Sequence, residues 1–526
     1  MDISHLRHCQ ATPHWQKIGP HHHHGIAIPL FSLCTANSSG IGEFYDLLPL
    51  IDWAHVIGLD VIQLLPLNDT GEETSPYSAL SAFALNPLYL QLSALPGIDK
   101  FSILQDLLKK LALLNKTKNV QYAAVRSQKQ EFLTTYYTLM GQKLQQNEKY
   151  QFFLNSTPWL KGYAVFKILK KLYLGASWER WPESQNPIND ELFDQIIESE
   201  KELYQELCIT QFLCDMQLQE VKKYSTLKNV FIMGDVPILI ARDSADVWEH
   251  RQIFDLNYSA GAPPDVYAKD GQNWGFPIYN WSILEKQEYR WWIERLQWAT
   301  RYYHMYRIDH IVGFFRIWAI PKGNSSQDGH FIPHDKNEWI ALGEKILKMM
   351  LSNCEMLPIG EDLGVVPDEV RACLKRLGIC GTRVMRWERR WNQDKKYIMP
   401  QNYNFDSLAT VSTHDSQTLQ QWWRDCPEEA KLWAEMEGWT YQNMLSASQH
   451  RKILWDSHHC GSLFHVNLLP EYLTLLPEYC DNNIDEQRIN VPGVVTDTNW
   501  SYRLPLPFEE IAQNDSLRHL MIELIT

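Results

Sequence analysis

The stretch HMYRIDHI (304–311) mixes apolar and aromatic residues and carries a carboxylate near its end; it is one of eight short runs spaced along the chain. The other seven are GIAIPLFSL (25–33), DVIQLLPL (60–67), VFIMGDVPI (230–238), MLPIGED (356–362), GTRVMRW (381–387), LATVSTHD (408–415) and RINVPGV (488–494). Because the runs are nearly continuously apolar and do not alternate strictly, they predict strands of a parallel sheet covered by helices.

Helical patterns lie between these runs, for example FYDLLPLIDWAHVIG (44–58) and NEWIALGEKILKMMLSN (337–353). Alternation of strands and helices is typical of an α/β protein with a parallel sheet. Eight such units predict a (β/α)8 TIM barrel, here with large insertions that are mostly helical or loop-like.

The uneven spacing of the runs predicts how the chain is organised. We expect an N-terminal segment over 1–24 and a catalytic barrel over 25–526. Residues 68–229 read as a mostly helical insertion, since they are too many for one crossover helix. Residues 239–303 read as an active-site loop insertion, and 416–487 as a mixed insertion.

Composition excludes several classes of function. The chain has 526 residues and a formal net charge of −14, which disfavours nucleic acid and anionic membranes as partners. No apolar run approaches the ~18 residues of a membrane span, and the first residues lack the apolar stretch of a signal peptide. Ten cysteines occur without any Cys-x-x-Cys pair. We therefore expect a soluble, cytoplasmic protein from a reducing compartment.

Two further features have both a functional and a plain structural interpretation. Aromatic residues make up 12% of the chain, which fits core packing or a cleft that stacks hydroxyl-rich ligands. The four consecutive histidines His21 to His24 could hold a metal weakly, but four neighbouring side chains cannot all face one ion. We expect a solvated segment there.

Carboxylates stand at the ends of four of the runs: Asp235, Asp309, Glu361 with Asp362, and Asp415. Each alone could be a helix N-cap. In a barrel, however, the C-terminal ends of the strands converge on one site, so these groups are expected to crowd one cleft. Crowding and burial would separate their pKa values, as acid–base chemistry requires.

Arg307 stands two residues before Asp309, so both side chains should lie on the same side of the strand. The arginine could then hold Asp309 ionised and aimed. An ionised carboxylate opposite a protonated one is the arrangement of a retaining glycosidase, in which the two groups lie ~5–5.5 Å apart.

An ordered set of motifs carries a family resemblance. The segments are SPY (75–77) with SAFALNP (81–87), GDVPI (234–238) with DSADVW (243–248), GAPPDVYAKDGQNWGFPIYNW (261–281), YRIDH (306–310), GEDLG (360–364), STHD (412–415), and RINVPG (488–493) with NW (499–500). In this order the set resembles the 4-α-glucanotransferases called amylomaltases or disproportionating enzymes, relatives of the α-amylase clan. The resemblance runs from about residue 25 to about 510.

The resemblance implies roles for three carboxylates. Asp309 is expected to be the nucleophile that forms a β-glycosyl-enzyme, and Glu361 the acid that protonates the leaving oxygen and then activates the acceptor. Asp415 is expected to bind the hydroxyls of the distorted sugar ring. The implied activity is transfer of α-1,4-glucan segments between maltooligosaccharides or glucans, by a retaining double displacement without metal or other cofactor.

The resemblance also implies a set of substrate-binding residues. Arg307 pairs with the nucleophile, His310 and His414 contact the same sugar, and Asp235 anchors the site from behind. Tyr77 is expected to stack on a glucose unit. Trp274, in a glycine-rich loop that reads as a lid, is expected to line the acceptor side, together with its neighbour Asn273.

Other classes of function remain as alternatives. A hydrolase of the α-amylase kind would use the same carboxylates, with water as the acceptor. A glucan-binding protein without activity would need the aromatic residues but not Asp309, Glu361 and Asp415 together. A phosphate-cofactor enzyme is disfavoured, because neither GDVPI nor GEDLG has the spacing of a phosphate-binding loop.

Overall fold

The computed structural model describes residues 3–182, 189–264, 269–479 and 483–526. Its centre is a sheet of eight parallel strands: β1 (His23–Ala27), β2 (Val61–Gln63), β3 (Phe231–Val236), β8 (Met305–Ile308), β11 (Leu357–Gly360), β12 (Gly381–Val384), β13 (Ser407–Thr410) and β14 (Phe464–Leu468). The strand order is β11-β8-β3-β2-β1-β14-β13-β12. A parallel bridge between Ile359 and Cys380 joins the two outer strands. The sheet is therefore the barrel of a TIM fold, as predicted.

Seven of the eight predicted strands overlap a barrel strand, but the eighth prediction is wrong. No strand forms in 488–494, and the missing strand is β14, inside the range expected to be an insertion. The sequence of β14, FHVNL, does not read as an apolar run, because His465 and Asn467 are polar although both are fully buried. Ser457 O accepts from His465, and Asn467 accepts from the backbone of Val411, so burial leaves neither side chain unpaired.

The helices around the barrel follow amphipathic patterns. In α13 (Asp368–Leu377) the buried residues are Val370, Cys373, Leu374 and Leu377, which share one helical face. Gly378 ends the helix in left-handed backbone with φ of 81°, a conformation that glycine adopts without steric cost. The remaining helices of the barrel layer include α2 (Leu47–Ile57), α11 (Arg290–Ala299), α12 (Lys336–Asn353), α18 (Phe508–Ala512) and α19 (Asp515–Ile525).

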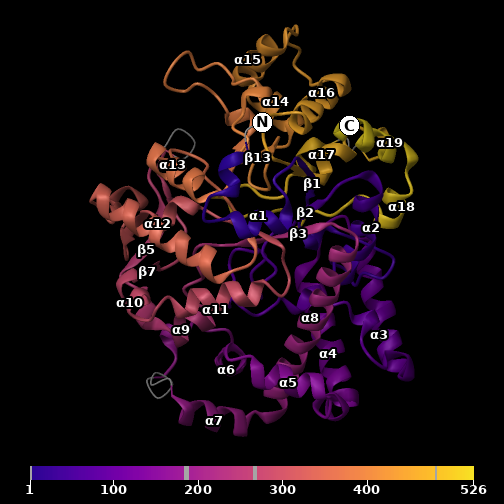
Figure 1. Cartoon of the computed structure of the whole chain (residues 1–526). Coiled ribbons are helices and arrows are strands. Elements are labelled where there is room, and N and C mark those ends of the chain that lie inside the picture. The colour runs from indigo at the N-terminus through magenta and orange to yellow at the C-terminus, as the bar shows by residue number, and fades with distance from the viewer. Residues whose placement is uncertain (1–2, 183–188, 265–268, 480–482) are drawn as a thin grey trace.

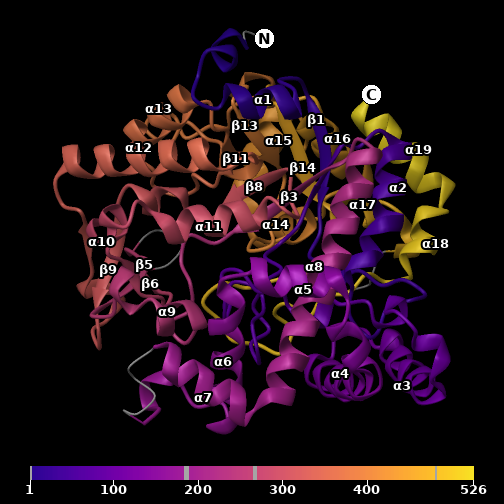
Figure 2. The ribbon, with the colours of Figure 1, turned by 60° about the horizontal axis from the view of Figure 1, so that its bottom comes forward.

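A group of helices between β2 and β3 lies on one side of the barrel in both ribbon views (Figures 1 and 2). It comprises α3 (Ser102–Ala112), α4 (Tyr122–Gln145), α5 (Glu148–Ser156), α6 (Trp159–Leu172), α7 (Asp190–Ser199) and α8 (Lys201–Leu227). One buried ion pair attaches this group to the barrel: Lys129 of α4 contacts Glu43 and donates to the carbonyls of Leu88 and Leu90. The pair and its hydrogen bonds satisfy a lysine that is 1% exposed.

Two smaller sheets lie outside the barrel sheet. A four-stranded antiparallel sheet has the order β10-β9-β5-β6, and a two-stranded sheet pairs β4 with β7. Their bounds are β4 (Phe254–Asp255), β5 (Tyr258–Ala262), β6 (Gln272–Asn273), β7 (Ile278–Tyr279), β9 (Ile317–Pro321) and β10 (His330–Ile332). The other helices are α1 (Thr12–Ile18), α9 (Ala245–Glu249), α10 (Trp281–Lys286), α14 (Leu419–Asp425), α15 (Pro427–Glu437), α16 (Ala447–His458) and α17 (Leu469–Leu473). Residues 265–268 of the predicted active-site loop lie outside the described residues.

The expectation of a solvated histidine segment is only half correct. His21 and His22 are exposed, but β1 begins at His23, which is fully buried, and His24 is partly buried. The start of the barrel thus lies within the segment predicted to precede it.

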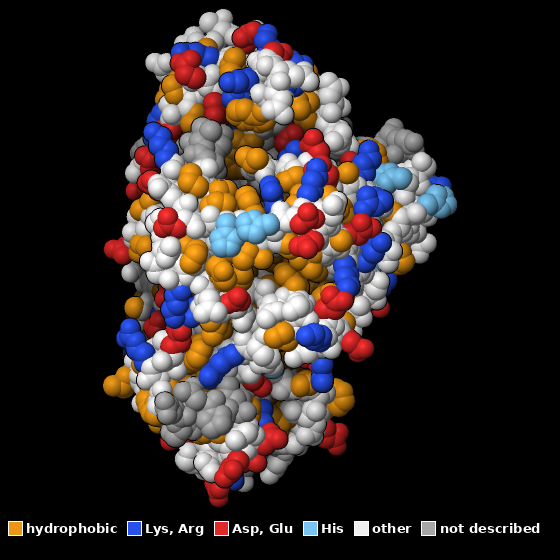
Figure 3. All heavy atoms as spheres, turned by 90° about the vertical axis from the view of Figure 1, so that its left-hand side faces the viewer, with side chains coloured by type: hydrophobic (Ala, Val, Ile, Leu, Met, Phe, Trp, Pro, Cys, Tyr) orange, Lys and Arg blue, Asp and Glu red, His pale blue; other side chains and the backbone are white. Residues whose placement is uncertain are grey.

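Within the described part of the chain, no helix is long and apolar enough to cross a membrane. On the face shown in Figure 3, acidic and basic side chains are interspersed, and neither sign forms a large continuous patch. The acidic net charge is therefore not concentrated on this face.

Candidate active site

The predicted carboxylates meet because each one follows the C-terminal end of a barrel strand. Asp309 comes directly after β8, and Glu361 directly after β11, its neighbour in the sheet. Asp415 lies five residues beyond the end of β13. Parallel strands of a barrel end at the same rim, so three segments far apart in sequence deliver carboxylates to one place.

Arg307, the third residue of β8, is the centre of the site. Its Nη2 contacts Asp309 Oδ1 at 3.0 Å and Glu361 Oε2 at 3.4 Å. Its Nη1 donates to Asp235 Oδ2 at 2.7 Å. The predicted contact between Arg307 and Asp309 is confirmed, and one guanidinium nitrogen additionally lies between the carboxylates of β8 and β11.

The backbone after β8 brings Glu361 close to this arginine. The N–H of His310 donates to Glu361 Oε2 at 2.6 Å. His310 has a φ of 49° and a ψ of 52°, left-handed backbone that is uncommon for a residue with a side chain. Such a conformation costs about 1–3 kcal/mol and persists where surrounding contacts hold it. Here it directs an N–H at a carboxylate.

Burial raises the pKa values of two carboxyl groups in the site. It raises the pKa of Glu361 to about 7; Arg307 opposes the rise, and the charge of Asp309 adds to it. It raises the pKa of Asp235 to about 6, again against the effect of Arg307. The side chains of Glu361 and Asp309 keep 20% and 28% of their surface exposed, so both remain accessible to a ligand. A carboxyl group with a pKa near 7 can both donate and accept a proton at neutral pH.

Asp415 has the opposite balance. Burial raises its pKa, but His414 and Asn490 more than offset this effect and lower the pKa to about 2. His414 Nε2 lies 3.3 Å from Asp415 Oδ2, and Asn490 Nδ2 donates to Asp415 Oδ1 at 2.6 Å. Asp415 is therefore an ionised hydrogen-bond acceptor at neutral pH.

Tyr77 connects the two halves of the site. Its hydroxyl donates to Asp235 Oδ2 at 2.7 Å and lies 3.0 Å from His414 Nε2. The rings of Tyr77 and His414 are stacked at a centroid distance of 5.5 Å, and Trp500 lies 5.9 Å from each of them. These rings form an aromatic group beside the carboxylates.

Trp274 approaches the site from the four-stranded sheet. Its ring packs edge-on against His310 at a centroid distance of 4.9 Å. The backbone N–H of Trp274 donates to Ala260 O, and its indole N–H donates to the side chain of Gln272. The residue is half-buried and hydrogen-bonded to its sheet. Asn273 is exposed, and its side chain accepts from Gly275 N.

One carboxylate at the end of a strand is not part of the site, and two residues that contact the site were not predicted from the sequence. Asp362 is buried and binds Arg383, Arg371 and the backbone of Thr382, so it has a structural role. Asn490 and Trp500 belong to motifs used for the resemblance but had no role assigned. The segment 488–494, which was predicted to be a strand, is a loop. Its residue Asn490 donates hydrogen bonds to His414 and Asp415.

Taken together, the contacts place an ionised acceptor, a carboxyl group with a pKa near 7 and a shared arginine beside aromatic rings. This set can protonate a leaving oxygen and stabilise positive charge on a sugar ring. The charges of the carboxylates are met by Arg307, His414 and hydrogen-bond donors, which is unlike a cluster of free oxygen ligands for a metal.

The chain is similar in sequence and in fold to known proteins. The family model described as 4-alpha-glucanotransferase matches residues 28–507. The 4-alpha-glucanotransferase of Chlamydia pneumoniae is 43% identical over 526 residues, covering 100% of this chain and 99% of the relative. That of Chlamydia caviae is 42% identical, with 97% and 96% covered. The fold also matches an amylomaltase from Streptococcus agalactiae in complex with acarbose, with a TM-score of 0.82, 23% identity, and 96% and 99% of the two chains covered. The chain belongs to the 4-alpha-glucanotransferase family.

Proposed function

We propose that this 4-alpha-glucanotransferase moves α-1,4-glucan segments between maltooligosaccharides or longer glucans by a retaining double displacement. The observation that carries the proposal is the pair of contacts from one guanidinium nitrogen of Arg307 to Asp309 and Glu361. Such a pair of neighbouring carboxyl groups is what a covalent, retaining mechanism needs, whereas an inverting enzyme needs room for a water molecule between them.

In the first step, the Asp309 carboxylate attacks the anomeric carbon of the donor and forms a β-linked ester. The glycosidic bond breaks, and its oxygen leaves with the proton of Glu361. The pKa of about 7 that burial gives Glu361 supports this role, because a substantial fraction of the molecules carries the proton at neutral pH. Arg307, 3.0 Å from Asp309, contacts this carboxylate during the step.

In the second step, the 4-hydroxyl of an acceptor glucan attacks the same carbon. Its proton passes to Glu361, which is now ionised, and the ester to Asp309 breaks. Two inversions restore the α configuration. Transfer in place of hydrolysis requires that a glucan reach the ester before water does.

The remaining residues bind and shape the sugar. Asp415, with its lowered pKa, is proposed to accept hydrogen bonds from the ring hydroxyls of the reacting glucose, with His414 beside it. Tyr77 is proposed to stack on that glucose. His310 contacts the same unit, and Trp274 lines the acceptor side.

Two further residues complete the proposed site. Asp235 lies behind Arg307 and Tyr77 and is proposed to hold both in place. Asn273, next to Trp274, is exposed and is proposed to reach the acceptor glucan. No cofactor takes part in the proposed reaction.

Trapping the ester tests the mechanism. In Glu361→Gln, an α-glucosyl fluoride needs no protonation of its leaving group, so the first step should stay fast and the second should be slow. One glucosyl unit should then accumulate on the peptide that carries Asp309, as seen by mass spectrometry. Added azide, which needs no base, should release α-glucosyl azide. The double variant Asp309→Asn/Glu361→Gln is the control and should stay unlabelled; a label on another peptide contradicts the assignment.

Incubation with maltotriose alone tests transfer against hydrolysis. Transfer should yield free glucose and a ladder of longer maltooligosaccharides while the number of reducing ends stays constant. A rise in reducing ends that parallels glucose, without longer products, would show a hydrolase.

A further inference from the structure

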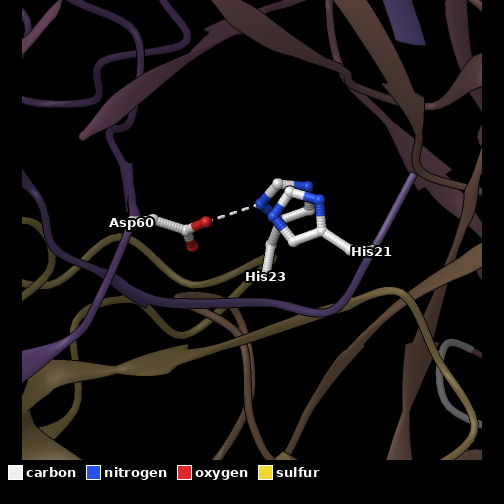
Figure 4. Close-up of side chains that lie close together, drawn as sticks. All are labelled: His21, His23 and Asp60. Atoms are coloured by element: carbon white, nitrogen blue, oxygen red, sulfur yellow. Dashed lines mark hydrogen bonds and ion pairs between the residues drawn. The ribbon is translucent and has the colours of Figure 1, made fainter. Parts of the chain in front are cut away.

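A second group of polar side chains lies at the opposite end of the barrel from the carboxylates. His23 is the first residue of β1, and Asp60 directly precedes β2, so both stand where the strands begin. His21 precedes β1 by two residues. The possible ligand atoms of these three residues all lie within 4.8 Å of one another (Figure 4).

The hydrogen bonds of His23 leave one ring nitrogen directed at Asp60. His23 Nε2 lies 2.8 Å from Gly19 O, and since a carbonyl oxygen only accepts, Nε2 carries the hydrogen. Nδ1 is hydrogen-bonded to Asp60 Oδ2 at 2.6 Å, and a bound ion would replace this hydrogen bond. A histidine that donates one N–H to a backbone carbonyl and presents its other nitrogen to a shared position is the usual arrangement of a metal-binding histidine.

Asp60 is held in a similar way. Its Oδ1 accepts the backbone N–H of His24 at 3.0 Å, which leaves Oδ2 facing His23. The carboxylate is therefore oriented by the start of β1, independently of any ion. Its side chain is 27% exposed, so solvent and ions can reach it.

Gly19 makes room for the third residue. The ring of His21 lies over Gly19, where a Cβ would be 2.6 Å from both Nδ1 and Cε1 of that ring. Gly19 has a φ of 97°, a conformation that other residues rarely adopt. The His21 ring consequently lies 4.2 Å from that of His23, measured between centroids. The exposed His21 can adjust its side chain by small rotations to complete a site.

The alternation of the extended chain separates these ligands from the other two histidines of the run. His22 Nδ1 lies 2.9 Å from His465 Nε2, and His24 Nδ1 lies 3.0 Å from His458 Nδ1. Successive side chains of a strand point to opposite faces. His21 and His23 thus share one face with Asp60, while His22 and His24 face α16 and β14.

We propose that His21, His23 and Asp60 bind one divalent transition-metal ion, with Zn²⁺ as the ion to be tested. Two imidazole nitrogens and a carboxylate oxygen are a ligand set that Zn²⁺ accepts, and solvent supplies the remaining position. The ion would join the segment before the barrel to the starts of β1 and β2. Its place far from the catalytic rim implies a stabilising role, not a part in transfer.

Titration calorimetry of the full chain with Zn²⁺, after treatment with a chelator, tests the site. Wild type should bind one ion per chain. His21→Ala changes an exposed residue, and Asp60→Asn preserves the acceptor for His24 N; each should weaken binding about 10-fold or more. Zn²⁺ should raise the Tm of wild type but not of His21→Ala, because an ion that binds only the folded chain stabilises it. Transfer activity should be the same with and without Zn²⁺.

His22→Ala is the matched control, since His22 is also exposed but lies on the other face. It should retain wild-type affinity. If His22→Ala binds as weakly as His21→Ala, the ion is held by the histidine run as a whole, and the proposed site is wrong. Absence of one-to-one binding in wild type, or unchanged affinity in both His21→Ala and Asp60→Asn, also overturns it.

Discussion

The backbone N–H of His310 donates to Oε2 of Glu361 over 2.6 Å, joining the loop after β8 to the end of β11. This bond and the contact with Arg307 act on the same carboxylate oxygen. Both interactions favour the ionised form of Glu361, whereas burial and Asp309 favour the protonated form. The balance leaves the group able to change protonation state near neutral pH, as an acid that later acts as a base must do.

The pH dependence of activity should report this balance. Because the first step needs protonated Glu361 and its pKa is about 7, kcat/KM for maltotriose should fall about tenfold per pH unit well above pH 7. An α-glucosyl fluoride donor needs no acid, so its kcat/KM should lack this alkaline fall. If the fall persists with the fluoride, another group is responsible for it.

Replacing Arg307 with lysine should damage the site although the charge is kept. A single ammonium cannot make the separate contacts that the guanidinium makes with Asp235, Asp309 and Glu361. We expect kcat/KM to fall about 10²–10³-fold. Since Arg307 opposes the rise in the pKa of Glu361, weaker contact should also move the alkaline fall to higher pH. The control variant Arg290→Lys, which changes an exposed ion pair with Glu294, should have the kcat/KM of wild type.

Asn490→Ala tests a residue that the sequence did not single out. The change removes a 2.6 Å hydrogen bond to Asp415, and bonds to charged groups contribute about 1.5–3 kcal/mol. We expect kcat to fall about 10–100-fold while the Tm stays near that of wild type. Asn324→Ala, at an exposed position, serves as the control. Full activity of Asn490→Ala would show that Asp415 does not depend on this donor.

Tyr77→Phe separates the hydroxyl from the ring. It removes one hydrogen bond from Asp235 and one from His414, while Arg307 and Asp415 still contact them, so we expect kcat to fall about tenfold. Tyr77→Ala also removes the ring and should raise KM further. Steady-state kinetics with maltotriose distinguishes the two effects. Tyr224→Phe, which removes a partly buried hydrogen bond to Asp52, is the control. Equal KM values in the two Tyr77 variants would argue against stacking on sugar.

Lys129→Met tests how the helices between β2 and β3 are attached. It leaves Glu43 and the carbonyls of Leu88 and Leu90 buried without their donor. Breaking a buried ion pair costs about 3–5 kcal/mol, so the midpoint of urea unfolding should fall clearly. Lys110→Met breaks an exposed pair with Glu131 and should cost at most about 1 kcal/mol. Equal midpoints for the two variants would contradict this.

The pattern of apolar residues along the sequence was sufficient to predict most strands of the barrel. Seven apolar runs predicted seven of its strands, because strands buried on both faces typically consist of nearly continuous apolar runs. The same reasoning placed Asp309 and Glu361 together, since residues that follow parallel strands meet at one rim. The spacing of Arg307 and Asp309 predicted their contact correctly. These features depend only on the period of the backbone and on the direction of the strands.

Only the tertiary structure determines which polar side chains are buried and which distant residues contact each other. The polar side chains of β14 are buried because Ser457 and Val411, from other segments, satisfy them. Asn490 reaches Asp415 across 75 positions of sequence, through a loop that no periodicity marks. The position of His310 between Trp274 and Glu361 likewise depends on three separate elements. Residue type and spacing determine which groups can react, but their pKa values and partners follow from distances that exist only after the chain has packed.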